Sequence, residues 1–282
     1  MTTPIAGELE QLLPNFYRLC APNPGQMTGP GTNTYIYGDK ELAIFDAGPP
    51  IPQHVAAILA VQDTLAAPIT TMFASHTHKD HSPAIAQVAE QLGDVRLIGI
   101  SAAPGQLFED PTFKPHHQPL DDEVIKLVDG SVRAIHTPGH VGNHVCYLIE
   151  EHQLLTTGDH LMNGSTVVIV PPKGSMTAYV ASLKKLQHYA IKVMAPGHGG
   201  LIQNPAEVVE WTIQHRLQRE AKVIANLTTE RIDVGQLVAL VYDDVDVSLH
   251  QMAELSLNAH LIKLALDGRV LESEQGWYLP AQ

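Results

Sequence analysis

The sequence predicts an α+β protein in which helices cover β-sheets and a helical module follows at the C-terminal end. Two patterns lead to this fold class. Over the first two hundred residues, short β-rich runs alternate with helix-like runs, and hairpin signals join two pairs of strands. After about residue 228, two helical patterns precede a short two-stranded segment. Because the strands form hairpins, a doubly wound parallel sheet is not expected.

The predicted strands are short runs rich in β-branched and aromatic residues. Asp129-Gly130 is a hairpin turn between two of them, and the polar run EEHQ at 150–153 joins the next two. The strands are expected at 34–38, 42–48, 69–75, 95–100, 124–128, 132–136, 145–149, 154–158, 167–170 and 191–195.

Helices are expected between and after these strands. Ser82 is the predicted N-cap of one helix, with Pro83 at its first position, a favourable start. The long polar helix from Pro205 marks the join between a first domain over 1–204 and a second over 205–282. Three helices are expected within the first two hundred residues, at 53–61, 83–92 and 176–189. The helix at the join is expected at 205–227.

The C-terminal module has its own pattern of elements. Residues 233–242 form one apolar helical run, and a second begins at Ser248 and stops at Gly268. Residues 269–280 then predict a short hairpin. Two helices followed by a two-stranded wing are the order of a winged-helix module.

Composition argues against several classes of function. The chain has 282 residues, 44% of them hydrophobic, which is enough for a large core. Its net charge of −13 disfavours a large phosphate-binding surface. Only Cys20 and Cys146 are present, far apart in sequence, so neither a disulfide framework nor a thiolate metal site is expected.

The N-terminal segment predicts no secretion signal. Glu8 and Glu10 stand where a signal peptide has a basic start and an apolar run, and no run is long enough to span a membrane. The sequence therefore predicts a soluble, cytoplasmic protein. Its 16 histidines are the compositional exception, and histidine is the commonest metal ligand.

The stretch 75-SHTHKDHSPA-84 concentrates candidate ligands between a strand and a helix. His76 and His78 are two residues apart, so an extended turn directs both rings to one ion. Asp80 and His81 follow where the chain enters the helix, and are expected to face a second ion. A polar loop with hydrogen-bonded histidines is the alternative, which this spacing and placement disfavour.

Three later residues complete the set, each at the end of a predicted strand. They are His140 in HTPGH, Asp159 after a glycine in TTGDHL, and His198 in APGHGG. Such nitrogen and oxygen ligands are the inventory of a two-metal hydrolytic centre. They suit zinc best, and iron and manganese also fit these ligand types.

In this pattern the chain resembles a metallo-β-lactamase-fold hydrolase over residues 10–204. The shared features are an early Asp46, H-x-H-x-D-H, T-P-G-H, G-D after a hairpin, and a late G-H-G. The resemblance implies an αββα sandwich and two zinc ions per chain. It implies that His76, His78 and His140 bind the first metal, that Asp80, His81 and His198 bind the second, that Asp159 bridges them, and that Asp46 orients ligands.

A narrower resemblance covers nearly the whole chain. The segments 31-GTNTYIYG-38, 215-HRLQRE-220 and 249–270 are similar to the lactamase-beta-like branch with a C-terminal winged helix. That branch includes the animal mitochondrial endoribonuclease and glyoxalase-II-like thioesterases acting on polyketide carriers. It therefore implies architecture more sharply than substrate.

The expected mechanism is attack by a metal-bridging hydroxide, with Asp80 orienting it and accepting its proton. The leading substrate hypothesis is a carboxylic thioester, and the alternative is a single-strand-specific endoribonuclease. From Pro205 onward, six Lys or Arg stand against twelve Asp or Glu, a balance of −6, which argues against a nucleic-acid-binding regulator. The appended module argues against a β-lactamase.

Two residues are candidates for contact with a small-molecule substrate or single-stranded RNA. Asn33 precedes an early strand, and Lys173 lies in a loop that follows the Asp159 segment. The winged helix is expected to pack over the active site or to form a homodimer surface. No membrane partner is expected.

Overall fold

The computed structural model describes residues 3–103 and 109–281, which form two compact units. The first unit comprises residues up to Thr137, Asn143–Ser165 and Ala190–Pro205. The second comprises Pro138–Gly142, Thr166–Tyr189 and the chain from Ala206 onward. The domain boundary expected before Pro205 stays a prediction. No helix in the described ranges has both the length and the apolarity needed to cross a membrane.

A six-stranded mixed sheet forms one layer of the first unit, with its strands in chain order. The first four strands are antiparallel neighbours, whereas the last two pairs are parallel. The parallel pairs need crossovers, which α1 (Pro52–Leu65) and α2 (Pro83–Leu92) supply. The strands are β1 (Leu9–Leu13), β2 (Phe16–Cys20), β3 (Asn33–Tyr37), β4 (Leu42–Phe45), β5 (Ile69–Phe73) and β6 (Arg96–Ile98).

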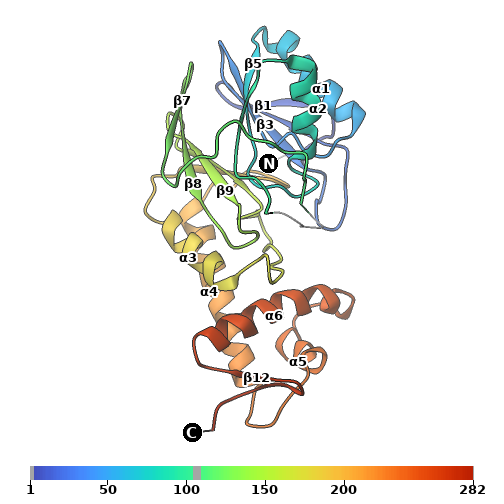
Figure 1. Ribbon diagram of the computed structural model, residues 1–282, viewed down its shortest axis with the longest axis vertical. Helices are drawn as coiled ribbons and strands as arrows, with labels where there is room; N and C mark the ends of the chain where they lie inside the picture. Colours follow the sequence, from blue (N-terminus) through green and yellow to red (C-terminus); the bar gives the residue numbers. More distant parts are fainter. Residues whose placement is uncertain (1–2, 104–108, 282) are drawn as a thin grey trace. The chain divides into compact units, whose positions relative to one another are not determined.

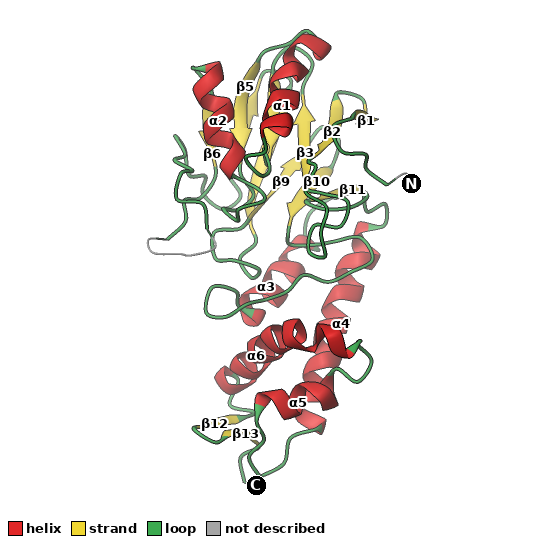
Figure 2. Ribbon diagram, turned by 90° about the vertical axis from the view of Figure 1, so that its right-hand side faces the viewer, coloured by secondary structure: helices red, strands yellow, loops and turns green. Residues whose placement is uncertain are grey.

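Helices α1 and α2 lie against one face of this sheet (Figure 2). The core between them contains Ile58 of α1, Ile85 of α2 and Met72 of β5, all fully buried. Burying these side chains on one face leaves the other face of the sheet for a second layer.

That second layer is a five-stranded sheet in the order β11-β10-β9-β8-β7 (Figure 1). Between the sheets, the rings of Phe45 and Phe73 stack at 4.7 Å, and Tyr147 lies 4.9 Å from Phe73. The strands are β7 (Val124–Leu127), β8 (Gly130–His136), β9 (Val145–Ile149), β10 (Leu154–Gly158) and β11 (Val193–Pro196). All pairs are antiparallel except β10 and β11.

The second unit is mostly helical. Its helices are α3 (Met176–Leu186), α4 (Pro205–Ala225), α5 (Val234–Val241), a short 3-10 helix (Val247–Leu249) and α6 (His250–Leu266). The strands β12 (Leu271–Ser273) and β13 (Gly276–Tyr278) form an antiparallel hairpin. Leu237, Leu257, Leu261 and Trp277 share one buried core. The order of two helices followed by a wing confirms the predicted module.

One expected strand is absent, and one predicted helix start is confirmed in position. Residues 167–170 form no strand, because side chains take their backbone groups: Arg216 donates to the Val167 carbonyl at 2.6 Å and Ser256 accepts from Ile169 N at 3.4 Å. Ser82 is the N-cap residue of α2 and Pro83 follows at its start, as predicted, but the Ser82 hydroxyl donates to Asp110 at 2.8 Å and makes no capping hydrogen bond.

Candidate metal centre

The loop from Ser75 to Ser82 joins β5 to α2 and brings candidate ligands to the carboxyl end of the strand. Asp46 follows the neighbouring strand β4 and holds this loop. Its Oδ1 accepts from Ser75 N at 2.7 Å, and its Oδ2 accepts from the Ser75 hydroxyl at 2.6 Å. The same Oδ2 lies 3.0 Å from His81 Nδ1. Asp46 therefore fixes the ring of His81 with Nε2 turned the other way.

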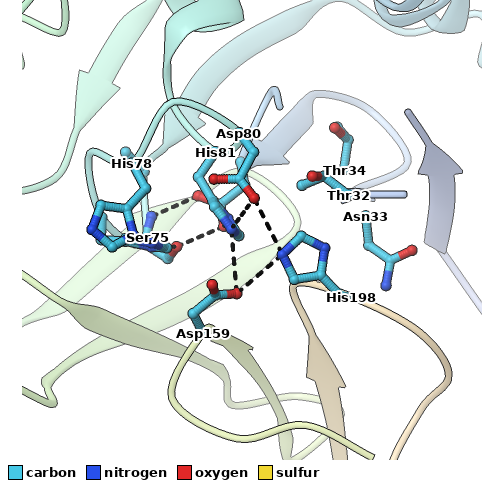
Figure 3. A network of polar contacts seen from close by, with 12 residues as sticks. Thr32, Asn33, Thr34, Ser75, His78, Asp80, His81, Asp159 and His198 are labelled. Atoms are coloured by element: carbon cyan, nitrogen blue, oxygen red, sulfur yellow. Dashed lines mark hydrogen bonds and ion pairs between the residues drawn. The ribbon is translucent and has the colours of Figure 1, made fainter. Parts of the chain in front are cut away.

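The side chains of Asp80, His81, Asp159 and His198 converge on one another (Figure 3). His81 Nε2 lies 3.6 Å from Asp80 Oδ2 and 3.3 Å from Asp159 Oδ1. His198 Nε2 lies 3.3 Å from the same oxygen of Asp80 and 3.4 Å from that of Asp159. Four ligands held tetrahedrally at about 2.0–2.1 Å from zinc lie about 3.3–3.4 Å from one another. Three of the four distances match that spacing, so the set is suited to one divalent cation.

A second set of ligand atoms lies beside the first. His76 Nε2 is 3.0 Å from His78 Nδ1, and Asp159 offers an oxygen within 4.8 Å of both rings. Two ring nitrogens turned toward each other are suited to a shared cation, because each offers a lone pair when neutral. Asp159 contacts both sets, which is the position a bridging carboxylate needs.

The outer nitrogens of these rings have partners that fix their orientation. His76 Nδ1 lies 3.0 Å from the Ser75 hydroxyl, and His198 Nδ1 lies 3.2 Å from the Gly31 carbonyl. In both rings Nε2 is thereby left to face the ligand set. Ser75 was not singled out from the sequence, although it directly precedes the histidine motif.

The predicted ligand His140 stands in the loop Pro138–Gly142 between β8 and β9, which is described with the second unit. There its Nδ1 lies 2.9 Å from the Val168 carbonyl. This contact leaves Nε2 as the nitrogen for coordination. Its place in the first set stays a prediction.

Glycines allow the strand ends to approach the ligands closely. A Cβ on Gly197 would lie 2.7 Å from His81 Cε1 and 2.9 Å from Asp159 Oδ1. A Cβ on Gly158 would lie 2.5 Å from the Ser75 hydroxyl oxygen. Gly158 also has a φ of +44°, which favours glycine. A glycine is therefore needed before Asp159 for two reasons: there is no room for a side chain beside Ser75, and the backbone has a positive φ.

The ligand groups perturb one another electrostatically. Burial opposes protonation of His81, but the carboxylates of Asp159 and Asp80 outweigh it and raise the pKa of His81 well above its ordinary value. Burial is likewise outweighed at His198, whose pKa Asp159 and Asp80 raise. For Asp80, burial would raise the pKa, but His81 and His198 hold it lower. The carboxylates thus attract positive charge, which a divalent cation supplies as well as protons do.

Asn33, a predicted substrate contact, is fully buried. Its amide donates to the carbonyls of Pro196 at 3.0 Å and Gly199 at 2.9 Å, and Tyr35 also donates to Pro196 at 2.8 Å. These bonds favour a role in holding the loop that carries His198. The role in substrate binding stays a prediction, as does that of Lys173, which is half-buried in the second unit.

His144 and His160 are fully buried, and the ring of His144 lies 5.1 Å from that of His76. The Thr137 hydroxyl lies 2.9 Å from His144 Nδ1, and His144 Nε2 accepts from Asp159 N at 3.2 Å. His144 therefore supports the backbone of Asp159.

Comparison with known proteins identifies two regions. Residues 27–198 match the Metallo-beta-lactamase superfamily, and residues 234–277 match the Beta-lactamase associated winged helix domain. An atrochrysone carboxyl ACP thioesterase of Emericella nidulans is 30% identical over 281 residues, covering 97% of this chain and 85% of its own. A beta-lactamase-like protein 2 homolog of Drosophila melanogaster is 29% identical, covering 94% and 92%.

Solved structures show the same fold at low identity. A metallo-beta-lactamase family protein of Thermus thermophilus has a TM-score of 0.77 at 21% identity, covering 96% of this chain and all of its own. A beta-lactamase domain protein of Burkholderia ambifaria has a TM-score of 0.83 at 18% identity, covering 99% and 95%. With the winged-helix match, these likenesses confirm the predicted fold class.

Proposed function

Because this chain is a hydrolase that belongs to the metallo-beta-lactamase superfamily, we propose that it is a dinuclear zinc enzyme that hydrolyses carboxylic thioesters. The observation that carries this proposal is the pair of adjacent ligand sets that share Asp159. Membership of the superfamily implies divalent metal ions, and ligands limited to imidazole and carboxylate favour zinc. The thioester is supported by the name of the Emericella relative.

In this proposal three histidines bind the first ion, a second set binds the other, and Asp159 contributes to both. His140 is included because its loop joins β8 to β9, strands of the sheet whose next strand ends beside Asp159. The first set is His76, His78 and His140, and the second is Asp80, His81 and His198.

The two ions, once bound, would supply a hydroxide nucleophile from water and would stabilise negative charge on the attacked carbonyl. The protein holds the reacting groups around that position. Asp80 is suited to orient the water and to take its proton at the carboxylate, because its side chain is 30% exposed whereas His81 is fully buried. Asp46 and the Gly31 carbonyl keep the imidazoles of His81 and His198 in place.

Metal analysis and a substrate panel test the proposal on one sample of purified protein. We expect about two zinc ions per chain and hydrolysis of acyl thioesters, with no cleavage of single-stranded RNA or of a simple phosphodiester. Cleavage of RNA alone would support the endoribonuclease alternative and exclude the thioesterase. An active protein without metal would overturn the proposal.

Substitution of Asp80 tests its role in the reaction. We expect Asp80→Ala to reduce thioester turnover by at least about a hundredfold, since general base catalysis contributes roughly that much. Far-UV circular dichroism should remain that of the wild type. Asp63→Ala, an exposed carboxylate on α1, is the control and should retain full activity.

A further inference from the structure

The ring of His78 is oriented differently from those of its neighbours. His76, His81 and His198 each turn Nδ1 outward, to the Ser75 hydroxyl, to Asp46 and to the Gly31 carbonyl respectively. His78 instead turns Nδ1 inward, 3.0 Å from His76 Nε2. Its Nε2 therefore points outward, and the group that it meets there decides how firmly the ring is held.

That group is the carboxylate of Glu109, whose Oε1 lies 3.7 Å from His78 Nε2. Glu109 is only 3% exposed, and Oε1 has no hydrogen-bond donor among the described residues. A buried carboxylate oxygen without a donor is unfavourable unless positive charge or an N–H group faces it. The outward N–H of a metal-bound His78 is such a group.

The other oxygen of Glu109 belongs to a buried chain of hydrogen bonds. The Thr77 hydroxyl donates to Oε2, and Asn143 donates to the Thr77 oxygen at 2.7 Å. Asn143 also donates to the Ile100 carbonyl at 3.1 Å. The carboxylate is therefore held with Oε1 directed at His78.

The backbone around Glu109 is fastened to the ligand loop as well. His78 and Glu109 form an isolated antiparallel β-bridge, and Asp110 N donates to the Thr77 carbonyl at 2.6 Å. The Ser82 hydroxyl donates to Asp110 Oδ2 at 2.8 Å. Contacts at both ends of the histidine motif thus fix where Glu109 stands.

We propose that Glu109 is a positioning residue for the first metal ion. It holds the ring of His78 with Nδ1 toward the ion and with Nε2–H toward the Glu109 carboxylate. The inference rests on the proposed function, because it requires an ion at the first ligand set. A carboxylate on the outer nitrogen fixes the tautomer and makes the inner nitrogen a stronger donor to the metal. The negative charge of the Glu109 carboxylate also lies near the positive charge of the ion.

Glu109→Gln tests this role, since it removes the charge and keeps the shape. Zinc affinity is measured by chelator competition on the full chain, and the cobalt(II)-loaded protein gives an absorption spectrum of the ligand field. We expect one of the two ions to bind about tenfold more weakly or worse, the other to bind as in the wild type, and the cobalt spectrum to change. The metal-free variant should melt close to the metal-free wild type.

Glu123→Gln is the matched control, because Glu123 also pairs with a histidine of the first unit, at 2.7 Å from His117 Nε2. It should bind both ions normally. If the wild type binds two ions and Glu109→Gln binds both within twofold of it, the role of Glu109 is excluded while the proposed function stands. A wild type without zinc would overturn both.

Thr77→Val decides the matter if Glu109→Gln does not fold. It removes the hydroxyl that holds Oε2 and leaves the charge in place. We expect the affinity for one ion to fall about threefold. This loss is smaller than that expected for Glu109→Gln, because the carboxylate itself remains. Unchanged affinity for both ions would overturn the role of Glu109.

Discussion

Asp46 contacts two parts of the ligand loop with one carboxylate. Through the Ser75 hydroxyl it supports His76, and directly it orients His81. A residue that acts on both ligand sets should affect both ions when it changes. The resemblance to the metallo-β-lactamase fold implied this orienting role, because an early Asp is one of the features that carry it.

We expect Asp46→Asn to weaken binding of both zinc ions about tenfold or more, because an amide oxygen is a poorer partner for the His81 N–H than a carboxylate. Chelator competition measures the two affinities. Asp63→Asn serves as the control, and equal affinities in the two variants would contradict the role of Asp46.

His54 gives the first unit a dependence of stability on pH. Its ring is 1% exposed, and burial lowers the pKa of His54 to about 4, whereas the unfolded chain protonates it near its ordinary value of 6.5. Below that value the unfolded state binds a proton that the folded state does not. Proton binding by the unfolded chain therefore lowers the free energy of unfolding as the pH falls from about 6.5 toward 4. Above about pH 6.5 this loss of stability is absent.

We expect the wild type to lose up to about 3 kcal/mol more stability than His54→Gln between pH 6.5 and pH 4. Urea unfolding of both proteins at several pH values measures this difference. Comparing the two cancels the other titrating groups. Parallel curves would show that His54 titrates normally in the folded protein.

Single residues also mark the limit of prediction from sequence. The candidate ligands His76, His78, Asp80 and His81 were identifiable because they form one short motif with known spacing. Glu109 was not, because its relation to His78 arises from a β-bridge between segments thirty-one residues apart (109 − 78 = 31). No local pattern distinguishes it from other carboxylates.

At the level of elements, the end of β11 must pass very close to the ligands. Gly197 and Gly200 lie in the same loop, and neither has a positive φ. A Cβ on Gly197 would meet His81 and Asp159, whereas one on Gly200 would meet only Asn163, at 3.8 Å. Alanine substitutions at these two glycines therefore test the lack of room for a side chain, with backbone conformation left out of the comparison.

We expect Gly197→Ala to reduce zinc binding and thioester turnover at least about tenfold, because the ligands it displaces must hold their geometry closely. Gly200→Ala should retain both properties. Metal content and initial rates of the two variants, measured side by side, check this expectation. Equal losses in the two variants would contradict it.

Most strands followed from β-branched and aromatic runs, but β1 and β2 were missed. The run LEQLL of β1 has no β-branched residue, so its extended form depends on pairing with β2. The opposite error occurred at 167–170, where VVIV has high β-propensity but its backbone bonds to Arg216 and Ser256. In both segments tertiary contacts outweighed propensity.

At the scale of the whole molecule, tryptophan gives the second unit an optical signal of its own. Both tryptophans, Trp211 and Trp277, lie in the second unit. Trp277 shares a core with Leu257, which is fully buried on α6, whereas Leu266 on the same helix is 75% exposed. Tryptophan fluorescence therefore reports on the unfolding of this core.

We expect Leu257→Ala to destabilise the fluorescence-monitored transition by about 2–5 kcal/mol, because it removes buried methyl groups and leaves a cavity. Leu266→Ala should change it by less than about 0.5 kcal/mol. Both variants should bind zinc normally at 25 °C. Similar midpoints in urea for the two variants would contradict the buried position of Leu257.

The second unit draws on three stretches of chain, and this has a consequence for how such proteins diversify by recombination. Arg216 and Ser256 bond to the backbone of Val167 and Ile169, so residues distant in sequence complete one another. A crossover near residue 205 that exchanged only the later helices would leave those backbone groups facing foreign side chains. The C-terminal module is therefore inherited most safely together with the loops and the helix α3 that precede it.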